Sequence, residues 1–213
     1  MAVAKQKYDS PRQAARRDAI LECARSILSD LGYDGLTMRG LAHQAGVATS
    51  TLYTLYGNKD DLLLAAVDDL LIELAETTGA THKEGIEAIL HLNQVSTTQI
   101  QETPQYAQAM TRSLLRTGAD SRLVEVLFAS SYPFVLQHLE VAKDRREIRD
   151  ETDVVGIAKL LVGQQWGTVL LWMMGMLTLE QLGPESKRAQ VMILTNVARP
   201  ACGKLLRKLL LHL

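Results

Sequence analysis

The sequence predicts an all-α protein, with a small N-terminal domain built around a helix-turn-helix and a larger helical domain after it. Three observations favour this fold class. Apolar residues recur at helical spacing along most of the chain, its 213 residues include only five prolines, and β-branched residues seldom form clusters. A chain of this length can form one large domain or two small ones, each with a sizeable core.

Composition and hydropathy predict a cytoplasmic protein that does not enter a membrane. Hydrophobic residues make up 47% of the chain and charged residues 22%, as in ordinary folded proteins. The first 17 residues are polar and basic, unlike the apolar core of a signal peptide. The longest apolar run, Val169 to Leu177, is shorter than the roughly 20 residues that cross a bilayer as a helix. Cys23 and Cys202 lie far apart, so we expect two reduced cysteines.

Positive charge gathers near the N-terminus, although the whole chain has a net charge of −1. Residues 1–60 contain eight Lys and Arg against six Asp and Glu. Residues 1–17 contain one acidic residue, Asp9, and the basic residues Lys5, Lys7, Arg12, Arg16 and Arg17. This modest asymmetry permits contact with nucleic acid. We expect residues 1–11 to form a flexible basic arm.

The N-terminal domain is predicted over residues 12–62, and it begins with an amphipathic helix. The apolar face of this helix repeats at helical spacing and consists of Ile20, Ala24, Ile27, Leu28 and Leu31. Gly32 is expected to end the helix, because glycine readily adopts the left-handed conformation that a helix C-terminus requires.

A short helix and a tight turn follow. Thr37 is placed to cap a helix that runs from Met38 to Gln44 or Ala45, its hydroxyl accepting a hydrogen bond from a free backbone N–H. Ala45 is small enough to let two helices approach closely, and Gly46 can supply a positive φ. Two short helices joined in this way predict a helix-turn-helix.

The second helix of the motif is expected at about residues 48–54, with Val47 and Leu52 turned inward. Its outer side then carries short hydroxyl side chains. Such side chains suit a helix held against DNA, because they reach base edges and phosphates without pushing the backbone away. The sequence therefore predicts a DNA-recognition helix here.

Residues 63–213 are predicted to form the larger helical domain. Asn58 can cap its first helix, and Gly183-Pro184 and other short segments are expected to separate the later ones. Pro200 should kink or split the last helix. The predicted helices span residues 60–76, 83–102, 105–116, 121–143, 152–177 and 185–212.

The stretch TMRGLAHQAGVATSTLYTLYGNKDDLL, preceded by ILECARSILSDLGYDGL, resembles the N-terminal DNA-binding domain of the TetR family of transcriptional regulators. The resemblance runs from about Pro11 to Val67, roughly a quarter of the chain. It includes the Thr-x-Arg opening, the Ala-Gly-Val turn, the Thr-Leu-Tyr of the recognition helix and the Asn-Lys-Asp start of the next helix.

The resemblance implies a role in DNA binding for particular side chains. Thr49, Ser50 and Thr51 would occupy the groove-facing start of the recognition helix, and Tyr53 and Lys59 would each meet a phosphate. The full set of expected DNA contacts is Thr37, Arg39, Thr49, Ser50, Thr51, Tyr53, Thr54 and Lys59. Arg12, Arg16 and Arg17 are candidates for further contacts with the DNA backbone.

Leu55 is a departure from the family pattern, because it stands where a polar side chain often contacts a phosphate. Tyr56 is expected to replace an apolar ring in the core. The recognition helix also lacks an arginine or glutamine for bidentate reading of a base. The preference for particular operator sequences would then depend on Arg39, hydroxyl contacts, thymine methyl groups and DNA shape.

For the larger domain, the resemblance implies a homodimer formed through the last two long helices. It also implies a pocket between the middle helices for a small, apolar effector. The side chains expected to line this pocket are Met110, Leu114, Phe128, Phe134, Trp166 and Met173. Trp172 and Met176 lie on a second stripe of the Trp166 helix, so this helix either buries two sides or is an ordinary core helix.

The expected function is therefore a ligand-responsive repressor that binds a pseudo-palindromic operator as a dimer. No catalytic motif is found, no cofactor is expected, and the five histidines form no i, i+4 ligand pair for a metal. Two alternatives remain open. One is a dimeric ligand-binding protein that has kept the motif but lost operator binding. The other is a small helical enzyme, for which no polar constellation can be named.

Overall fold

The computed structural model describes residues 11–67, 69, 82–117 and 122–212. Within these ranges every regular element is a helix, and the single bridge between extended residues joins Ile148 to Ala198. The structure therefore confirms the all-α prediction. The basic arm predicted at residues 1–11 lies outside the described residues, except for Pro11, which begins the first helix.

The first helix, α1 (Pro11–Gly35), is kinked at Gly32, where φ is 66°. Gly32 adopts the positive φ that was predicted to end the helix, and one further helical turn follows this kink up to Gly35. Leu31 was wrongly expected in the core and is 67% exposed. After the kink the chain folds back, so that Gly35 lies against the Cβ of Leu31. Leu36 then supplies the buried apolar side chain.

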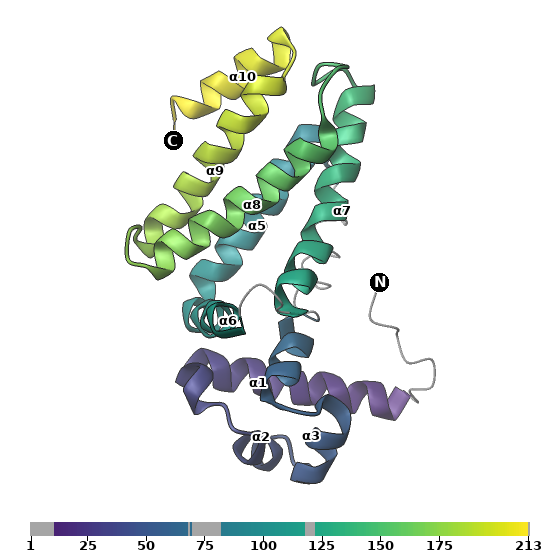
Figure 1. Cartoon of the computed structure of the whole chain (residues 1–213), viewed down its shortest axis with the longest axis vertical. Helices are drawn as coiled ribbons and strands as arrows, with labels where there is room; N and C mark the ends of the chain where they lie inside the picture. Colours follow the sequence, from purple (N-terminus) through teal and green to yellow (C-terminus); the bar gives the residue numbers. More distant parts are fainter. Residues whose placement is uncertain (1–10, 68, 70–81, 118–121, 213) are drawn as a thin grey trace.

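The motif that follows consists of α2 (Met38–Gln44) and α3 (Thr49–Tyr56), and a further helix covers residues 59–67. The predicted end of the recognition helix at residue 54 was short by two residues. Gly57, with φ 77°, ends α3, and its N–H donates to the carbonyl of Tyr53 at 2.9 Å. Figure 1 shows α2 and α3 at the end of the molecule farthest from α10.

The remaining helices form the body of the molecule, and Figure 1 shows α8 crossing in front of α5, between α7 and α9. The bounds of these helices are α5 (Gly85–Glu102), α6 (Pro104–Thr117), α7 (Arg122–Asp144), α8 (Val154–Met173), α9 (Leu179–Val197) and α10 (Pro200–Leu210). The predicted split at Pro200 is confirmed, because α9 ends before it and α10 begins with it.

The predicted break at Gly183-Pro184 was wrong, and the chain instead turns between Met173 and Leu179. Thr178 starts α9 with a capping box, in which its side chain and that of Gln181 each accept a bond from the other's backbone N–H. Pro184 is tolerated inside α9. The preceding Gly183 has no Cβ, so part of the usual clash with a proline ring is absent.

Three apolar clusters hold these helices together. The first contains the inner side chains of α1, α2, α3 and residues 62–67, and it also takes in Tyr106, Ala109 and Met110 of α6. The second joins α5, α7, α8, α9 and α10, and the third lies where α6, α8 and the start of α9 meet. Trp166 packs against all three clusters. Trp166 therefore lies at the junction between the helix-turn-helix end of the molecule and the body helices.

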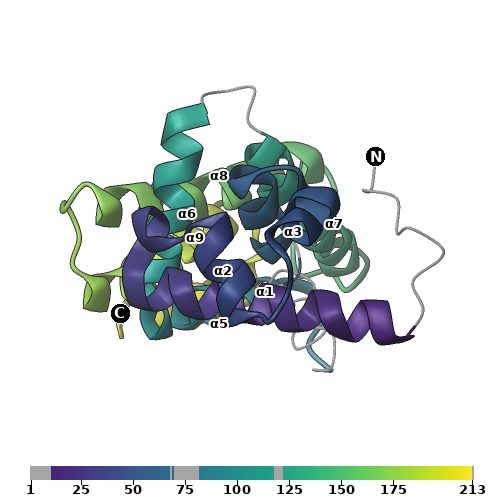
Figure 2. The same ribbon diagram turned by 90° about the horizontal axis from the view of Figure 1, so that it is seen from below.

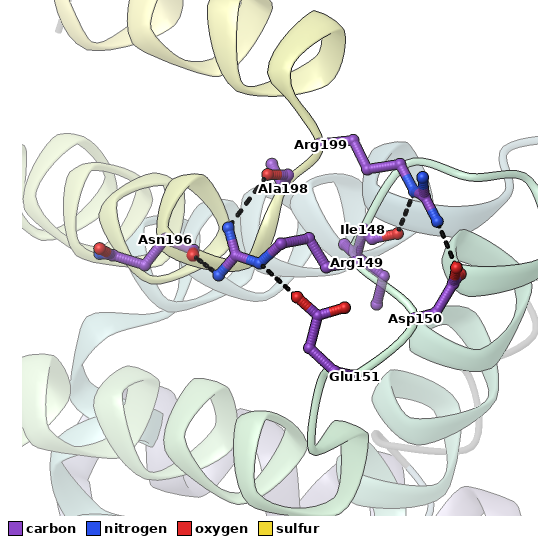
Figure 3. A network of polar contacts seen from close by, with 7 residues as sticks. All are labelled: Ile148, Arg149, Asp150, Glu151, Asn196, Ala198 and Arg199. Carbon is purple, nitrogen blue, oxygen red and sulfur yellow. Dashed lines mark hydrogen bonds and ion pairs between the residues drawn. The ribbon is translucent and has the colours of Figure 1, made fainter.

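Two arginines link the α7–α8 connection to the α9–α10 connection, at the end of the molecule opposite the motif, as Figure 3 shows. Arg199 donates from Nε to the carbonyl of Ile148 at 3.0 Å and pairs with Asp150 at 2.6 Å. This pairing lowers the pKa of the Asp150 carboxyl, mainly through the hydrogen bond. Arg149 reaches in the other direction, to the carbonyl of Ala198 at 3.5 Å. The α7–α8 and α9–α10 connections are thus bound to each other.

Helix α8 is long and apolar enough to cross a membrane by length and composition alone. It was not recognised from the sequence, because the prediction considered only the uninterrupted apolar run. In the structure, α8 packs against both α7 and α9 and buries residues such as Leu161, Val162 and Val169. Only the inner side of α8 is packed in this way, because 33% of its apolar stretch is buried.

Candidate DNA-binding interface

The helix-turn-helix is held by caps and by inward apolar side chains. Thr37 caps α2 as predicted, with its Oγ1 accepting the N–H of Gly40 at 3.0 Å. Gly46 adopts φ 64°, the left-handed conformation that favours glycine. Leu52 is fully buried, and the partly buried Val47 packs against the same cluster. The backbone of the motif is therefore fixed from its inner side.

The outer side of α3 is polar and exposed, and Figure 2 views the molecule from this end. Ser50, Tyr53 and Thr54 are exposed, and the Tyr53 side chain is 53% accessible. Thr49 and Thr51 are half-buried, so the predicted groove-facing row is less uniform than expected. The Thr54 hydroxyl donates to the carbonyl of Ser50 at 2.9 Å, which holds it close to the helix.

The last turn of α3 carries the two residues that depart from the family pattern. Leu55 is 44% exposed, so it adds an apolar side chain to the outer surface. Tyr56 is 8% exposed and belongs to the first cluster, as predicted. Burial raises the pKa of the Tyr56 hydroxyl, and the positive charge of the nearby Arg17 partly opposes this rise.

The basic side chains expected at the DNA fall into two groups. Arg39 is exposed on the first turn of α2, and Arg12 and Arg16 are exposed on the first turns of α1. Arg17 differs, because it is half-buried and its guanidinium acts on Tyr56 from inside the domain. The structure therefore brings Arg12 and Arg16 to one helical face but turns Arg17 away from it.

Lys59 follows the cap of the helix at residues 59–67. The side chain of Asn58 accepts the N–H of Asp61 at 2.9 Å, which is the predicted cap. The ammonium of Lys59 donates to the carbonyl of Tyr33 and lies over the ring of that residue. These contacts join the helix start to the end of α1. They were missed from the sequence, because Tyr33 lies 26 residues earlier in the chain.

The six residues expected in an effector pocket lie in different parts of the structure. Met110 belongs to the first cluster, Phe128 and Phe134 pack against the second, and Met173 packs against the third. Trp166 touches all three clusters. Leu114 lies in α6, and its side chain is outside the described part of the structure.

A cavity of about 260 Å³ lies elsewhere, beside the start of α8. Arg149, Asp153, Leu160 and Val197 are among its lining residues, and none of the six pocket candidates is. Among the described residues, no group of three or more His, Cys, Asp or Glu side chains could hold a metal ion.

The fold and this interface define a helix-turn-helix DNA-binding protein. Residues 20–66 match the sequence model described as bacterial regulatory proteins, tetR family. The N-terminal part of the chain therefore resembles the DNA-binding domain of tetR-family regulators.

Known relatives agree with this resemblance. The HTH-type transcriptional repressor KstR of Mycobacterium tuberculosis is 28% identical over 170 residues, which are 75% of this chain and 76% of KstR. A TetR transcription regulator from Haloarcula marismortui has a TM-score of 0.70 at 19% identity, covering 87% of this chain and 100% of the other. FadR of Thermus thermophilus, solved with lauroyl-CoA, has a TM-score of 0.68 at 19% identity and covers 86% and 96%. These two structures share the fold of this chain.

Proposed function

We propose that this protein is a homodimeric transcriptional repressor that binds a pseudo-palindromic operator and leaves it when a small molecule binds. The observation that carries the proposal is the exposed hydroxyl face of α3, held on a motif whose inner side is packed and capped. In a symmetric dimer, two such helices about 34–36 Å apart enter successive major grooves on one face of the DNA.

The proposed DNA contacts fall into base and phosphate contacts. Ser50 and Thr54 are exposed and small enough to approach base edges, and Tyr53 carries its hydroxyl outward to a phosphate. The whole proposed set is Thr37, Arg39, Thr49, Ser50, Thr51, Tyr53, Thr54 and Lys59, with Arg12 and Arg16 on neighbouring phosphates. The bond from Lys59 to Tyr33 gives that lysine a structural role beside its proposed electrostatic one.

We propose that dimerisation uses the outer faces of α8 and α9, the last two long helices. Leu160 and Leu171 of α8 and Met192 of α9 are exposed by 57%, 41% and 53%. Between the two leucines, Gly163 and Gly167 have no heavy atom within 4 Å of the position that a Cβ would take. Such open glycines let a second helix approach closely, which supports an interface here.

The proposed effector is small and largely apolar, and it binds among the body helices. Trp166 is the central candidate, because it touches all three clusters, with Met110, Leu114, Phe128, Phe134 and Met173 as the other candidates. Release of DNA requires that the effector bind the non-binding conformation more tightly, since equal affinity for both would shift nothing.

We further propose that the protein acts in the cytoplasm, where its operator is accessible. Residues 12–62 would read DNA, and residues 63–213 would bind the effector and the second subunit. The two parts are not independent, because α6 contributes to the core beneath the motif.

Selection of bound sequences from a random duplex library, at near-physiological salt, tests the proposed function. We expect a pseudo-palindrome to be recovered. The Tyr53→Phe variant should bind every selected sequence about 5- to 160-fold more weakly, because the dimer loses two hydrogen bonds to phosphates, one from each subunit. Tyr132→Phe on α7 is the matched control and should bind like the wild type. Weak binding without a recovered motif would favour a ligand-binding protein that no longer reads an operator.

Sedimentation tests the proposed dimer face. Leu160→Lys should weaken the dimer, because it places a charge in an apolar interface. Leu205→Lys on α10 is the control, since Leu205 is also exposed, by 65%, but lies off the proposed face. Equal dissociation of both variants, or of neither, would reject the assignment of the interface to α8 and α9.

A further inference from the structure

A group of polar side chains lies inside the apolar body, between α5, α8 and α9. We call Asn93, Gln164, Ser186 and Gln190 the amide cluster. Asn93, Ser186 and Gln190 are 1%, 0% and 2% exposed, and Gln164 is partly buried. Leu182, one turn before Ser186 on α9, belongs to the third apolar cluster, whereas the residue after Gln190 belongs to the second. The amide cluster therefore separates two apolar cores.

Hydrogen bonds join the three helices at Ser186. Asn93 Nδ2 donates to Ser186 Oγ at 3.1 Å. Gln164 Nε2 lies 3.4 Å from the same oxygen and 2.9 Å from Thr168 Oγ1. Gln190 is one helical turn beyond Ser186, so it lies on the same face of α9.

Three carbonyl oxygens in this cluster have no hydrogen-bond partner. They are Asn93 Oδ1, Gln164 Oε1 and Gln190 Oε1. Two neighbouring hydroxyls do not supply donors, because Thr97 donates to the backbone carbonyl of Asn93 at 2.9 Å and Thr168 donates to that of Gln164 at 3.0 Å. Ser186 has a single hydroxyl hydrogen, so at least two of the three oxygens are left without a donor. Buried acceptors without donors cost free energy, so the cluster favours a bound donor.

We infer that the amide cluster binds the neutral O–H or N–H end of a small molecule with an apolar body. An alcohol or a primary amide has this chemistry. The four side chains of the cluster carry no ionisable group, so a charged ammonium would be buried without a counter-ion. Leu92 and Val191, which are adjacent in sequence to Asn93 and Gln190, belong to the second apolar cluster and suit the apolar body.

This inference rests on the proposed function, whose effector it describes more closely. Both α8 and α9, which carry the proposed dimer face, contribute to the cluster. A donor that enters between α5 and these helices satisfies acceptors that the closed packing leaves unpaired. The ligand thus binds an opened arrangement more tightly than the closed one, and this difference is what moves a conformational equilibrium.

Calorimetric titration of the full chain with 1-octanol and its isomer 1-methoxyheptane tests the inference. The two probes have the same atoms, but only the alcohol has an O–H donor. We expect the alcohol to bind about tenfold more tightly or better, as sites built for a hydroxyl discriminate against analogues without it. Octanoate, whose carboxylate only accepts hydrogen bonds, should bind more weakly than the alcohol.

Gln190→Met removes one unpaired oxygen with little change of shape, and it should lower the affinity for 1-octanol about tenfold. Gln101→Met is the control, because Gln101 lies on α5 outside the cluster and donates to the carbonyl of Leu179 at 3.0 Å. It should bind 1-octanol like the wild type. Thermal unfolding of both variants verifies that each is folded.

Equal binding of the alcohol and the ether would overturn the inference, as would unchanged affinity in Gln190→Met. Absence of any 1-octanol binding to the wild type would also overturn it. Operator selection with the wild type, without ligand, is independent of these titrations. A recovered operator together with failed titrations would reject the amide cluster as a ligand site and leave the proposed repressor intact.

Discussion

The ammonium nitrogen of Lys59 lies 3.8 Å from the centroid of the Tyr33 ring and 2.5 Å from the carbonyl oxygen of the same residue. The contact joins the start of the helix at residues 59–67 to the last turn of α1. Both elements pack against the inner side of α2 and α3 in the first cluster. The contact between Lys59 and Tyr33 therefore helps to fix the position of the recognition helix.

Replacing either member of this pair should lower the free energy of unfolding. Lys59→Met and Tyr33→Leu each remove the cation–π contact, which contributes about 1 kcal/mol. Only Lys59→Met also removes a positive charge from each subunit, so only this variant should reduce the salt slope of DNA binding by the dimer by about 2. Chemical denaturation and binding at several salt concentrations measure the two effects. A salt slope that is unchanged in Lys59→Met would remove the proposed phosphate contact.

The turn of the motif should tolerate substitution in an order set by backbone conformation. Gly46 has φ 64° and no heavy atom within 4 Å of the position of a Cβ. A side chain there would not clash with neighbouring residues, so the cost of a substitution comes from the backbone conformation alone. Gly46→Ala should destabilise by about 1–2 kcal/mol. Gly46→Asn should cost less and Gly46→Val more, because asparagine tolerates the left-handed region and β-branched residues do not. Denaturation midpoints that follow side-chain volume instead would contradict this explanation.

Tyr106 should be replaceable by phenylalanine without loss of stability. Its hydroxyl is buried without a hydrogen-bond partner, and burial raises its pKa far above the ordinary value. Tyr106→Phe removes the unsatisfied group and keeps the ring in the first cluster, so the free energy of unfolding should stay equal or rise by up to about 1 kcal/mol. Thermal and chemical denaturation test this, and a loss larger than that would reveal a polar role for the hydroxyl.

His138 should make the folded state sensitive to mild acid. Burial lowers the pKa of His138, and the negative charge of Glu84 only partly offsets this. As the pH falls through about 6.5, the unfolded chain therefore binds a proton that the folded chain resists, and stability decreases. His138→Phe should reduce this loss, with its ring still beside that of Phe134, now 4.4 Å from the imidazole. Denaturation between pH 5 and 7.5 on both proteins, with the same slope in each, would disprove the assignment.

Local signals in the sequence were sufficient for the motif. Thr37, Gly46 and Asn58 act within three or four residues of themselves, so their caps and turn could be predicted. The start of α9 was missed because Gly183-Pro184 is a strong breaker in isolation, whereas the capping box at Thr178 fixes an earlier start. The prediction failed because these two local signals compete, and the capping box is the stronger one.

Contacts between distant segments could not be predicted in the same way. The partner of Lys59 depends on how α1 returns past the motif, and the amide cluster depends on the register of three helices. The polar pair Gln164-Gln165 within an apolar run was a signal that a buried polar site was present. It gave no indication of which residues on α5 and α9 would meet it.

Because α6 contributes to the first cluster, the DNA-binding domain is not an independent folding unit. Tyr106, Ala109 and Met110 fill the underside of a domain whose other core residues end at Val67. A chimaera that transplants only residues 11–67 onto another regulator would leave those apolar side chains facing a foreign surface. Any such graft must carry the helix Pro104–Thr117 with it, or find a host helix of matching shape.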